Sequence, residues 1–296
     1  MNALSLAIPV LQVAAIAALA PLLQGAMKSL RARLQGRPGP SPVQPYRDLV
    51  KLWGKEALLP EGASPVTIAA PGVVLGVALA FAAGLPLGPR NALDPLADAV
   101  ALVLLLALGR FALLLAALDT RSSFGGMAAS REATFGALVE PALLFSLFGA
   151  AALSGGTKIS ALNALPFSPA SVLAFAAFFL VALAETARVP VDNQETHYEL
   201  TMVHEGLLLE YSGWQLALLH GAAYVKQFAF LLLGGLLLPG QAWWAHLGWA
   251  LAMACGITFV ETALAKLRLF EVPQVLGTAF ILAATGIGLR LIGGTP

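Results

Sequence analysis

Long apolar runs alternate with short polar segments along the whole 296-residue chain. Eight of these runs are long enough to cross about 30 Å of hydrocarbon as helices, which rise about 1.5 Å per residue. No run alternates apolar and polar residues as membrane β-barrel strands do. The pattern therefore predicts an all-α polytopic membrane protein, forming a single integral membrane domain over residues 1–296. The predicted spans are Leu4–Met27, Val66–Leu87, Leu96–Leu118, Thr134–Leu153, Ser171–Val189, Trp214–Leu238, Trp243–Leu264 and Val272–Ile292.

Lysine and arginine gather in one set of the loops between these spans. Twelve lie in that set and three in the other, and an excess of positive charge marks cytoplasmic loops. We therefore expect both termini on the outer side, and long cytoplasmic loops after the first and fifth helices, residues 28–60 and 185–213. The twelve are Lys28, Arg31, Arg33, Arg37, Arg47, Lys51, Lys55, Arg121, Arg131, Arg188, Lys266 and Arg268.

Composition agrees with a membrane protein, because 58% of the residues are hydrophobic and only 11% are charged. Soluble domains carry about 25% charged residues. Cys255 is the single cysteine, whereas iron–sulfur clusters need about four cysteine ligands. We therefore expect no redox centre in this chain. Its partners include the lipid bilayer and no nucleic acid.

The first cytoplasmic loop has two parts. The proline-rich segment Arg37–Pro45 cannot be helical and turns the chain. After it, Tyr46, Leu49, Val50 and Trp53 fall at helical spacing with charged residues between them. This pattern predicts a short amphipathic helix that lies in the membrane interface or beneath a soluble partner. The basic residues 28–37 before it are expected to lie on anionic lipid.

The stretch Ala184–Gly213 holds six of the sixteen carboxylates and two of the four histidines. No glutamate lies three residues before a histidine and no HExxH occurs, so neither a di-iron nor a zinc site is predicted. Catalytic serine chemistry is excluded too, because the chain has no GxSxG. The acids and histidines suit a proton relay or an acidic docking rim for a basic partner.

Further ionisable residues lie within the predicted spans, where a charge costs about 2.5–3.5 kcal/mol unless it is paired or hydrated. Arg110 and Lys226 either form structural ion pairs or line a water-filled path. Glu140 either lines such a path too or lies near the N-terminus of its helix, where the helix dipole stabilises a negative charge. Its helix is predicted to begin after a flexible Gly-rich turn. For two other glutamates, Glu185 and Glu261, simple solvation at the cytoplasmic edge is the alternative. The complete set is Asp98, Arg110, Glu140, Glu185, His220, Lys226 and Glu261.

Three separated motifs resemble the subunit 1 (H) family of respiratory complex I, whose signature runs roughly LAETNRxPFDLPExExEL. The signature residues in register are Ala184, Glu185, Thr186, Arg188, Pro190, Asp192, Glu195, Glu199 and Leu200. The first loop is similar to the family's RxGPxxxxQPxxDxxKLxxKE through Arg37, Gly39, Pro40, Gln44, Pro45, Asp48, Lys51, Leu52, Lys55 and Glu56. Eight membrane helices agree with this family, so the resemblance covers essentially the whole chain.

The departures from the signature resemble a hydrogenase branch of the family. His197 stands where the quinone-reducing branch has a further glutamate, and His204 follows in a longer segment. The segments DNQETHYELTMVHE, ASREATFGALVEP and VETALAKLRLFEVP, with Lys226, are similar to the membrane subunits of formate hydrogenlyase and other group 4 NiFe hydrogenases, hydrogenase-4 included.

This resemblance implies an inner-membrane subunit that anchors a soluble redox arm and links its chemistry to proton movement. The implied partners are the NiFe large and small subunits, an iron–sulfur subunit and antiporter-like membrane subunits; the soluble ones would hold the NiFe centre and the clusters. Quinone binding is in doubt because the acidic segment is altered. The alternatives are the quinone-chamber subunit of an NADH:quinone oxidoreductase and a free-standing ion transporter.

The resemblance and the charge pattern together give two sets of candidate residues and no catalytic or metal-binding residue. The proton-path and coupling candidates are Glu140, Glu185, Arg188, Asp192, Glu195, Glu199 and Lys226, with His197 and His204 specific to the branch. The candidates for subunit docking are Arg37, Gln44, Asp48, Lys51, Lys55, Glu56, Lys266 and Arg268.

Overall fold

The computed structural model describes residues 3–87, 97–193, 202–238 and 242–292. Within these residues the chain forms nine α-helices and two short 3-10 helices, and the one β-type contact is an isolated bridge between Asp98 and Lys158. The elements are α1 (Ala3–Leu34), α2 (Gln44–Trp53), α3 (Pro65–Ala83), α4 (Ala99–Asp119), α5 (Ser123–Ser154), η1 (Ile159–Ala164), α6 (Pro169–Glu185), η2 (Glu205–Leu207), α7 (Gly213–Leu236), α8 (Trp243–Ala263) and α9 (Val272–Ile292).

The predicted all-α membrane fold is confirmed. Seven helices among the described residues are long and apolar enough to cross a membrane: α1, α3, α4, α5, α7, α8 and α9. The eighth predicted span is α6, an apolar helix of 17 residues, or about 25 Å. It is shorter than predicted because the chain turns at Thr186, before the predicted end of the span at Val189.

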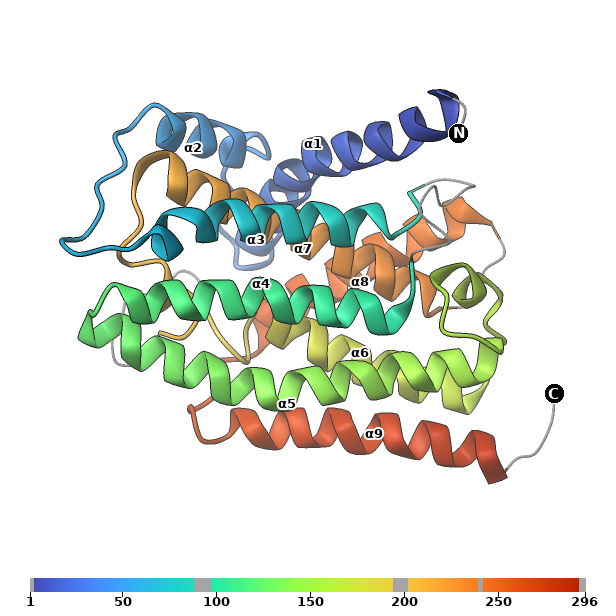
Figure 1. Cartoon of the computed structure of the whole chain (residues 1–296). Helices are drawn as coiled ribbons and strands as arrows, with labels where there is room; N and C mark the ends of the chain where they lie inside the picture. Colours follow the sequence, from blue (N-terminus) through green and yellow to red (C-terminus); the bar gives the residue numbers. More distant parts are fainter. Residues whose placement is uncertain (1–2, 88–96, 194–201, 239–241, 293–296) are drawn as a thin grey trace.

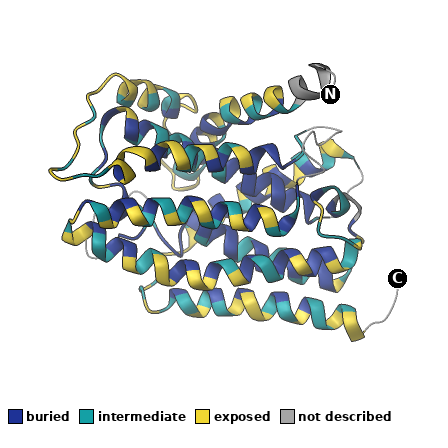
Figure 2. Ribbon diagram, viewed as in Figure 1, coloured by how far each residue is buried: buried dark blue, intermediate teal, exposed yellow. Residues whose placement is uncertain are grey.

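The helices form one bundle in which neighbours in space are often distant in sequence. Helix α3 packs against both α4 and α7, and α9 packs against α5 and α6 (Figure 1). Helix α1 begins and α9 ends at the same end of the bundle, on the right in this view. Buried residues gather on the sides of the helices that face one another (Figure 2). Phe230 of α7 packs on Phe81 and Phe178, with ring centroids 5.4 and 5.9 Å apart.

Helix α5 begins at Ser123, eleven residues before the predicted start at Thr134. The paired glycines of the predicted flexible turn are therefore helical residues. A Cβ on Gly125 would lie 2.9 Å from the carbonyl oxygen of Ala117, so this glycine lets the first turn of α5 pack closely against the end of α4. The prediction of a flexible turn was wrong because close packing between two helices, and not chain flexibility, requires this glycine.

Asp98 was predicted within a membrane span, and it instead caps the N-terminus of α4. Its Oδ1 accepts a hydrogen bond from the Val100 amide at 2.9 Å, and Thr157 donates to its other oxygen. This side chain therefore stabilises a helix end, as aspartate commonly does.

Candidate functional site

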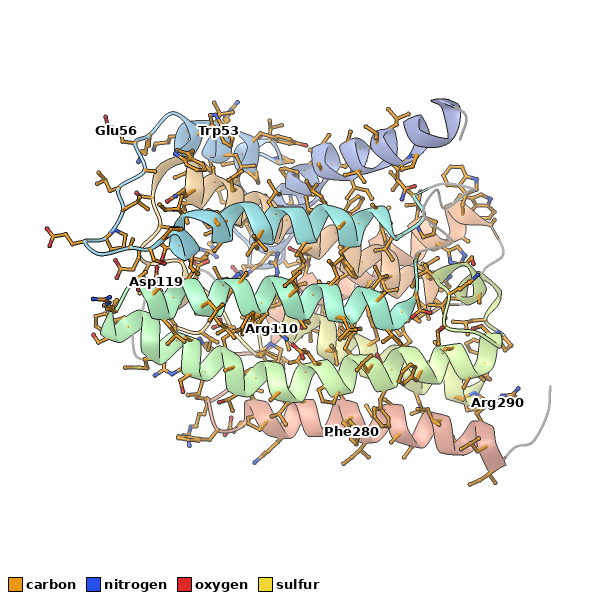
Figure 3. The ribbon with its side chains drawn as sticks, viewed as in Figure 1. Trp53, Glu56, Arg110, Asp119, Phe280 and Arg290 are labelled. Atoms are coloured by element: carbon orange, nitrogen blue, oxygen red, sulfur yellow. The ribbon has the colours of Figure 1, made fainter. Side chains whose placement is uncertain are left out.

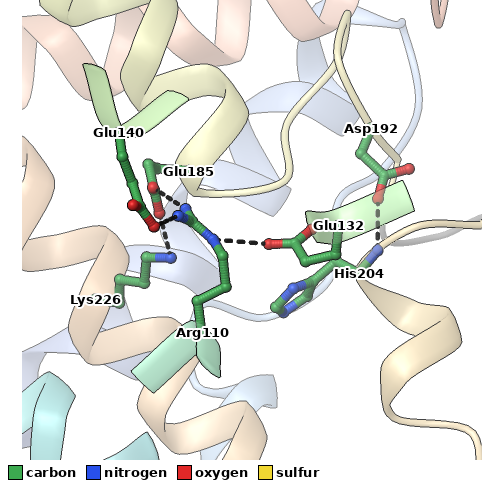
Figure 4. A network of polar contacts seen from close by, with 7 residues as sticks. All are labelled: Arg110, Glu132, Glu140, Glu185, Asp192, His204 and Lys226. Carbon is green, nitrogen blue, oxygen red and sulfur yellow. Dashed lines mark hydrogen bonds and ion pairs between the residues drawn. The ribbon is translucent and has the colours of Figure 1, made fainter. Parts of the chain in front are cut away.

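Arg110 of α4 lies at the centre of a cluster of charged side chains drawn from four helices. Its guanidinium contacts three carboxylates: Glu132 at 3.2 Å between Nε and Oε1, Glu140 through Nη1, and Glu185 through Nη2 (Figure 4). Lys226 of α7 completes the cluster, with its Nζ 2.6 Å from Oε2 of Glu185. We call these five residues the Arg110 cluster.

The sequence of α5 explains how one arginine reaches two of its acids. Glu132, Gly136 and Glu140 follow one another at four-residue spacing, so they share one face of the helix. A Cβ on Gly136 would lie 2.9 Å from Cδ of Arg110. The glycine therefore leaves space for the arginine to lie across α5 with one acid on either side.

Glu185 is the most enclosed acid of the cluster, with a side chain only 1% exposed. It is the last residue of α6, and Arg110 and Lys226 each contact one of its carboxylate oxygens. An unpaired carboxylate at this depth would be very costly, whereas one between two cations is compensated. The charge of Glu185 is therefore tied to the positions of these two cations.

A second cluster surrounds Arg188, three residues further along the chain. Its Nη1 lies 3.1 Å from Oε1 of Glu261 on α8, and its Nη2 donates to the side-chain oxygens of Gln24 on α1 and Gln227 on α7. Arg188 and Glu261 are both buried. This Arg188 cluster joins α1, α7 and α8 through one cation.

Asp192 holds the next part of the segment in place. Its Oδ1 lies 2.7 Å from Nζ of Lys266, and its Oδ2 accepts a hydrogen bond of 3.1 Å from the amide of His204 (Figure 4). Residues 185–192 are therefore buried in the bundle, although the sequence predicted that they begin a cytoplasmic loop.

His204 lines two of the cavities that adjoin the clusters. The first cavity encloses about 750 Å³, part of it open to solvent; its walls are mostly apolar, with Arg110, Glu132, Glu185 and Lys226 as the charged residues. The second encloses about 640 Å³ and is lined largely by polar and charged side chains. Its ionisable residues are Lys28, Arg31, Arg188, His204, Glu205, His220, Tyr224 and Glu261. Within the described part of the chain, His204 is the only titratable residue that lines both cavities.

The predicted coupling residues that the structure describes gather in one region. Glu140, Glu185 and Lys226 belong to the Arg110 cluster, Arg188 to the second, and Asp192 and His204 contact each other. Glu195, His197 and Glu199 lie outside the described residues.

Two alternatives from the sequence are wrong. Glu185 and Glu261 are not solvated, because both are buried and paired with arginines. Glu140 does not lie near a helix N-terminus, because α5 begins eleven residues earlier than predicted and Glu140 is in its middle. Arg110 and Lys226 do form ion pairs, and both also line the first cavity, so the structure is compatible with either of their alternatives.

Most of the docking candidates lie on the surface, away from the clusters. Gln44 donates to Asp48 at 2.9 Å within α2, and Glu56 lies with Trp53 at the edge of the molecule, far from Arg110 (Figure 3). Lys266 is the exception, because it pairs with Asp192. The exposed members are Arg37, Asp48, Lys51, Lys55, Glu56 and Arg268.

Sequence reasoning missed Arg110 as the centre of the site, and it missed Glu132 and the two glutamines. The four-residue spacing of Glu132, Gly136 and Glu140 was a usable signal, but it lay across the misplaced start of α5. No signal marked Gln24 or Gln227, whose roles depend on which helices adjoin.

A bundle of long apolar helices around buried, paired charges defines a polytopic membrane protein, and comparison with known proteins identifies it as a membrane subunit of a respiratory-type complex. The model of the NADH dehydrogenase family matches residues 6–289. The chain belongs to the NADH dehydrogenase family, and it is a multi-pass protein of the cell inner membrane.

Its relatives include members of both branches. It is 34% identical to formate hydrogenlyase subunit 4 of Escherichia coli, over 94% of this chain and 96% of the relative. It is 37% identical to hydrogenase-4 component C of the same organism, over 86% and 80%. Identity to an H-type subunit of the NADH-quinone oxidoreductase of Cereibacter sphaeroides is 32%, over 71% and 72%. The expected resemblance to the hydrogenase branch is therefore confirmed.

A solved structure shares the fold. A chain of the membrane-bound sulfane sulfur reductase, an archaeal respiratory membrane complex, superposes with a TM-score of 0.86 over 97% of this chain and 99% of that chain, at 18% identity.

Among the described residues, no group of three or more histidine, cysteine, aspartate or glutamate side chains is arranged to hold a metal ion.

Proposed function

We propose that this protein is the membrane anchor and coupling subunit of a formate hydrogenlyase-type, group 4 NiFe hydrogenase complex. It docks the soluble electron-transfer arm and links the redox chemistry of that arm to proton movement. The observation that carries this proposal is the buried Glu185, held between Arg110 and Lys226 within the membrane bundle. The identities to two hydrogenase subunits support the choice of complex.

The Arg110 cluster suits proton transfer because its acids share cations. It holds three carboxylates against two cations, so a proton added to one acid changes how Arg110 and Lys226 are shared among the others. Acids of this kind within membrane helices commonly form proton relays. Asp192 and Arg188 extend the path beyond the cluster, and Glu195, His197 and Glu199 are included in it from the sequence alone.

His204 is the branch-specific residue with a position on this path. A neutral imidazole has one donor and one acceptor nitrogen, so it can pass a proton along a hydrogen-bonded path. Its place between the two cavities supports a role in passing protons between the region of Glu261 and the Arg110 cluster.

The docking part of the proposal rests on the surface around α2. Val50 and Trp53 are 73% and 61% exposed, beside the exposed charges of Asp48, Lys51 and Lys55. Apolar side chains rimmed by charge are typical of a surface that a partner or a membrane covers. The NiFe large and small subunits and the iron–sulfur subunit would meet this surface, and antiporter-like subunits would pack beside the bundle. Further docking candidates are Arg37, Gln44, Glu56, Lys266 and Arg268.

One observation favours the second candidate, a quinone-chamber subunit. The first cavity has mostly apolar walls with a few charged residues among them, as a site for an amphipathic ring compound would. In that case a short-chain quinone should be reduced by the purified complex at a rate that depends on residues of this cavity.

Purification tests the proposed complex. The tagged protein, solubilised in a mild detergent, should bring down a NiFe large subunit and iron–sulfur subunits and should evolve hydrogen with a reduced dye. Recovery of NADH dehydrogenase subunits with quinone reductase activity would support the second candidate instead. A chain that is recovered alone and stable would contradict both proposals and favour an independent transporter.

A further inference from the structure

The end of α1 and the proline-rich segment after it enclose a hollow to which the proposed function assigns no ligand. It encloses about 620 Å³, part of it open to solvent. Three of its lining side chains are cationic, Lys28, Arg31 and Arg37, and no carboxylate from the described part of the chain lines it. We call it the basic hollow; its other lining residues are Ala32, Gln35, Pro38 and Pro40.

Close packing holds the far wall of the hollow in place. A Cβ on Gly39 would lie 2.8 Å from the carbonyl oxygen of Ser29, and a Cβ on Gly25 would overlap the carbonyl group of Pro42. The segment therefore folds back along the last turns of α1 at two points where only glycine fits. Pro38 and Pro40 have fixed backbone angles on either side of Gly39. This wall keeps its shape without a ligand, which lowers the entropic cost of binding one.

The position of the basic hollow fits a lipid headgroup. Lys28, Arg31 and Gln35 occupy the last turns of α1, or directly follow it, at one end of its apolar span. The sequence predicts that these basic residues lie on the cytoplasmic side. Basic pockets beside membrane helices on that side bind anionic headgroups, and each lysine or arginine near the surface strengthens the attraction.

We propose that the basic hollow is a binding site for the phosphate group of an anionic membrane lipid. Lys28 of α1 and Arg37 of the segment after it contact the phosphate, and the acyl chains enter the hydrocarbon beside the end of the α1 span. Lys28 and Arg31 also line the second cavity, so the bound headgroup lies beside the cavity that contains Arg188.

Native mass spectrometry of the full-length protein in an uncharged detergent tests this site. Phosphatidylglycerol is titrated against the wild type, a Lys28→Gln, Arg37→Gln double variant and an Arg33→Gln, Arg47→Gln control. The control removes the same charge from two exposed residues that do not line the hollow. We expect the wild type and the control to bind one phosphatidylglycerol tightly, the double variant to bind at least tenfold more weakly, and phosphatidylcholine not to bind at the site.

Equal weakening in the control, or equal affinity in all three proteins, would overturn the proposal. Inorganic phosphate provides the second arm: if it occupies the hollow and displaces phosphatidylglycerol at low millimolar concentration, the site is one for free phosphate and the lipid assignment fails. Loss of co-purifying subunits in the double variant with unchanged lipid binding would assign the hollow to a partner protein. If the double variant does not fold, Arg37→Gln alone, in the exposed segment, should still weaken lipid binding about threefold.

Discussion

At the scale of single residues, Arg110 decides the charge balance of the site. It is 10% exposed and contacts three acids, of which Glu185 is only 1% exposed. Replacing one partner of a buried ion pair leaves the other uncompensated, at a cost of about 3–5 kcal/mol. The structural role of Arg110 is therefore large even if proton transfer is set aside.

We expect Arg110→Gln to lower the thermal unfolding temperature in detergent by several degrees, because Glu132 loses its cation and Glu185 keeps only Lys226. Arg110→Lys should recover only part of the loss, since an ammonium group cannot reach three carboxylates with the geometry of a guanidinium. Arg33→Gln, at an exposed position, is the control and should change stability by less than about 0.5 kcal/mol. An Arg110→Gln variant as stable as the control would contradict the ion network.

Tyr211, before α7, gives a pH-dependent prediction. Its hydroxyl donates to the carbonyl oxygen of Thr67 at 3.0 Å, and burial, with a smaller effect of the nearby Asp119 charge, raises its pKa from 10.0 to about 12. The neutral phenol is thus favoured in the folded protein. Its stabilising contribution is complete below pH 10 and is lost as the pH rises toward 12.

The matching measurement compares thermal unfolding of the wild type with that of Tyr211→Phe between pH 8 and pH 12. The wild type should be more stable below pH 10, and the difference should disappear by pH 12. A difference that does not change across this range would show that Tyr211 ionises as easily when folded as when unfolded.

At the scale of elements, apolar runs predicted the bounds of a helix well wherever the helix ends at the end of its apolar run. Val272–Ile292 was predicted without error, and α8 ends one residue before its predicted end. Helix α5 was misjudged because its first turns carry Arg131, Glu132 and paired glycines, which interrupt an apolar run without interrupting a helix. Hydropathy alone therefore does not predict the polar turns by which a helix extends beyond its membrane span.

Gly25 tests how α1 holds the proline-rich segment. Gly25→Ala should displace Pro42 and the start of α2, lowering the unfolding temperature and weakening lipid binding at the basic hollow. Gly72→Ala in α3 is the matched control, because nothing lies within 4 Å of its Cβ position. The control should be neutral or more stable by about 0.5–1 kcal/mol, since alanine is the better helix former. Equal effects of the two substitutions would contradict the close packing.

At the scale of the whole molecule, sequence could identify which residues carry charge within the spans but not which of them meet. The meeting of Arg110 with Glu185 depends on α4, α5 and α6 packing together. Likewise, Arg188 donates hydrogen bonds to both Gln24 and Gln227 only because α1 and α7 pack against each other. These contacts are long-range products of helix packing, and no local pattern encodes them.

Orientation in the membrane follows from the loop charges and can be measured. Cys255 is exposed and is the only cysteine, so Cys255→Ser provides a cysteine-free background. In that background, Lys158→Cys should react with an impermeant maleimide in intact cells, and Glu61→Cys should react only in inverted vesicles. Both residues are exposed. Lys158 belongs to the connection after α5 and Glu61 to the connection between α2 and α3, and these connections lie at opposite ends of the bundle (Figure 1). The reverse labelling would place both termini in the cytoplasm.

The central claim is that buried acids of this subunit link hydrogen chemistry to proton movement, and proton translocation by the reconstituted complex tests it most directly. Glu140 is suited to the test because it contacts Arg110 yet is 35% exposed, so Glu140→Gln should fold. Proton uptake per hydrogen evolved is measured in proteoliposomes, with Glu199→Gln as a second variant and Arg33→Gln as the control. The account predicts unchanged hydrogen evolution in a soluble dye assay and at least fivefold lower translocation for both glutamate variants. Translocation equal to that of the wild type in both would contradict it.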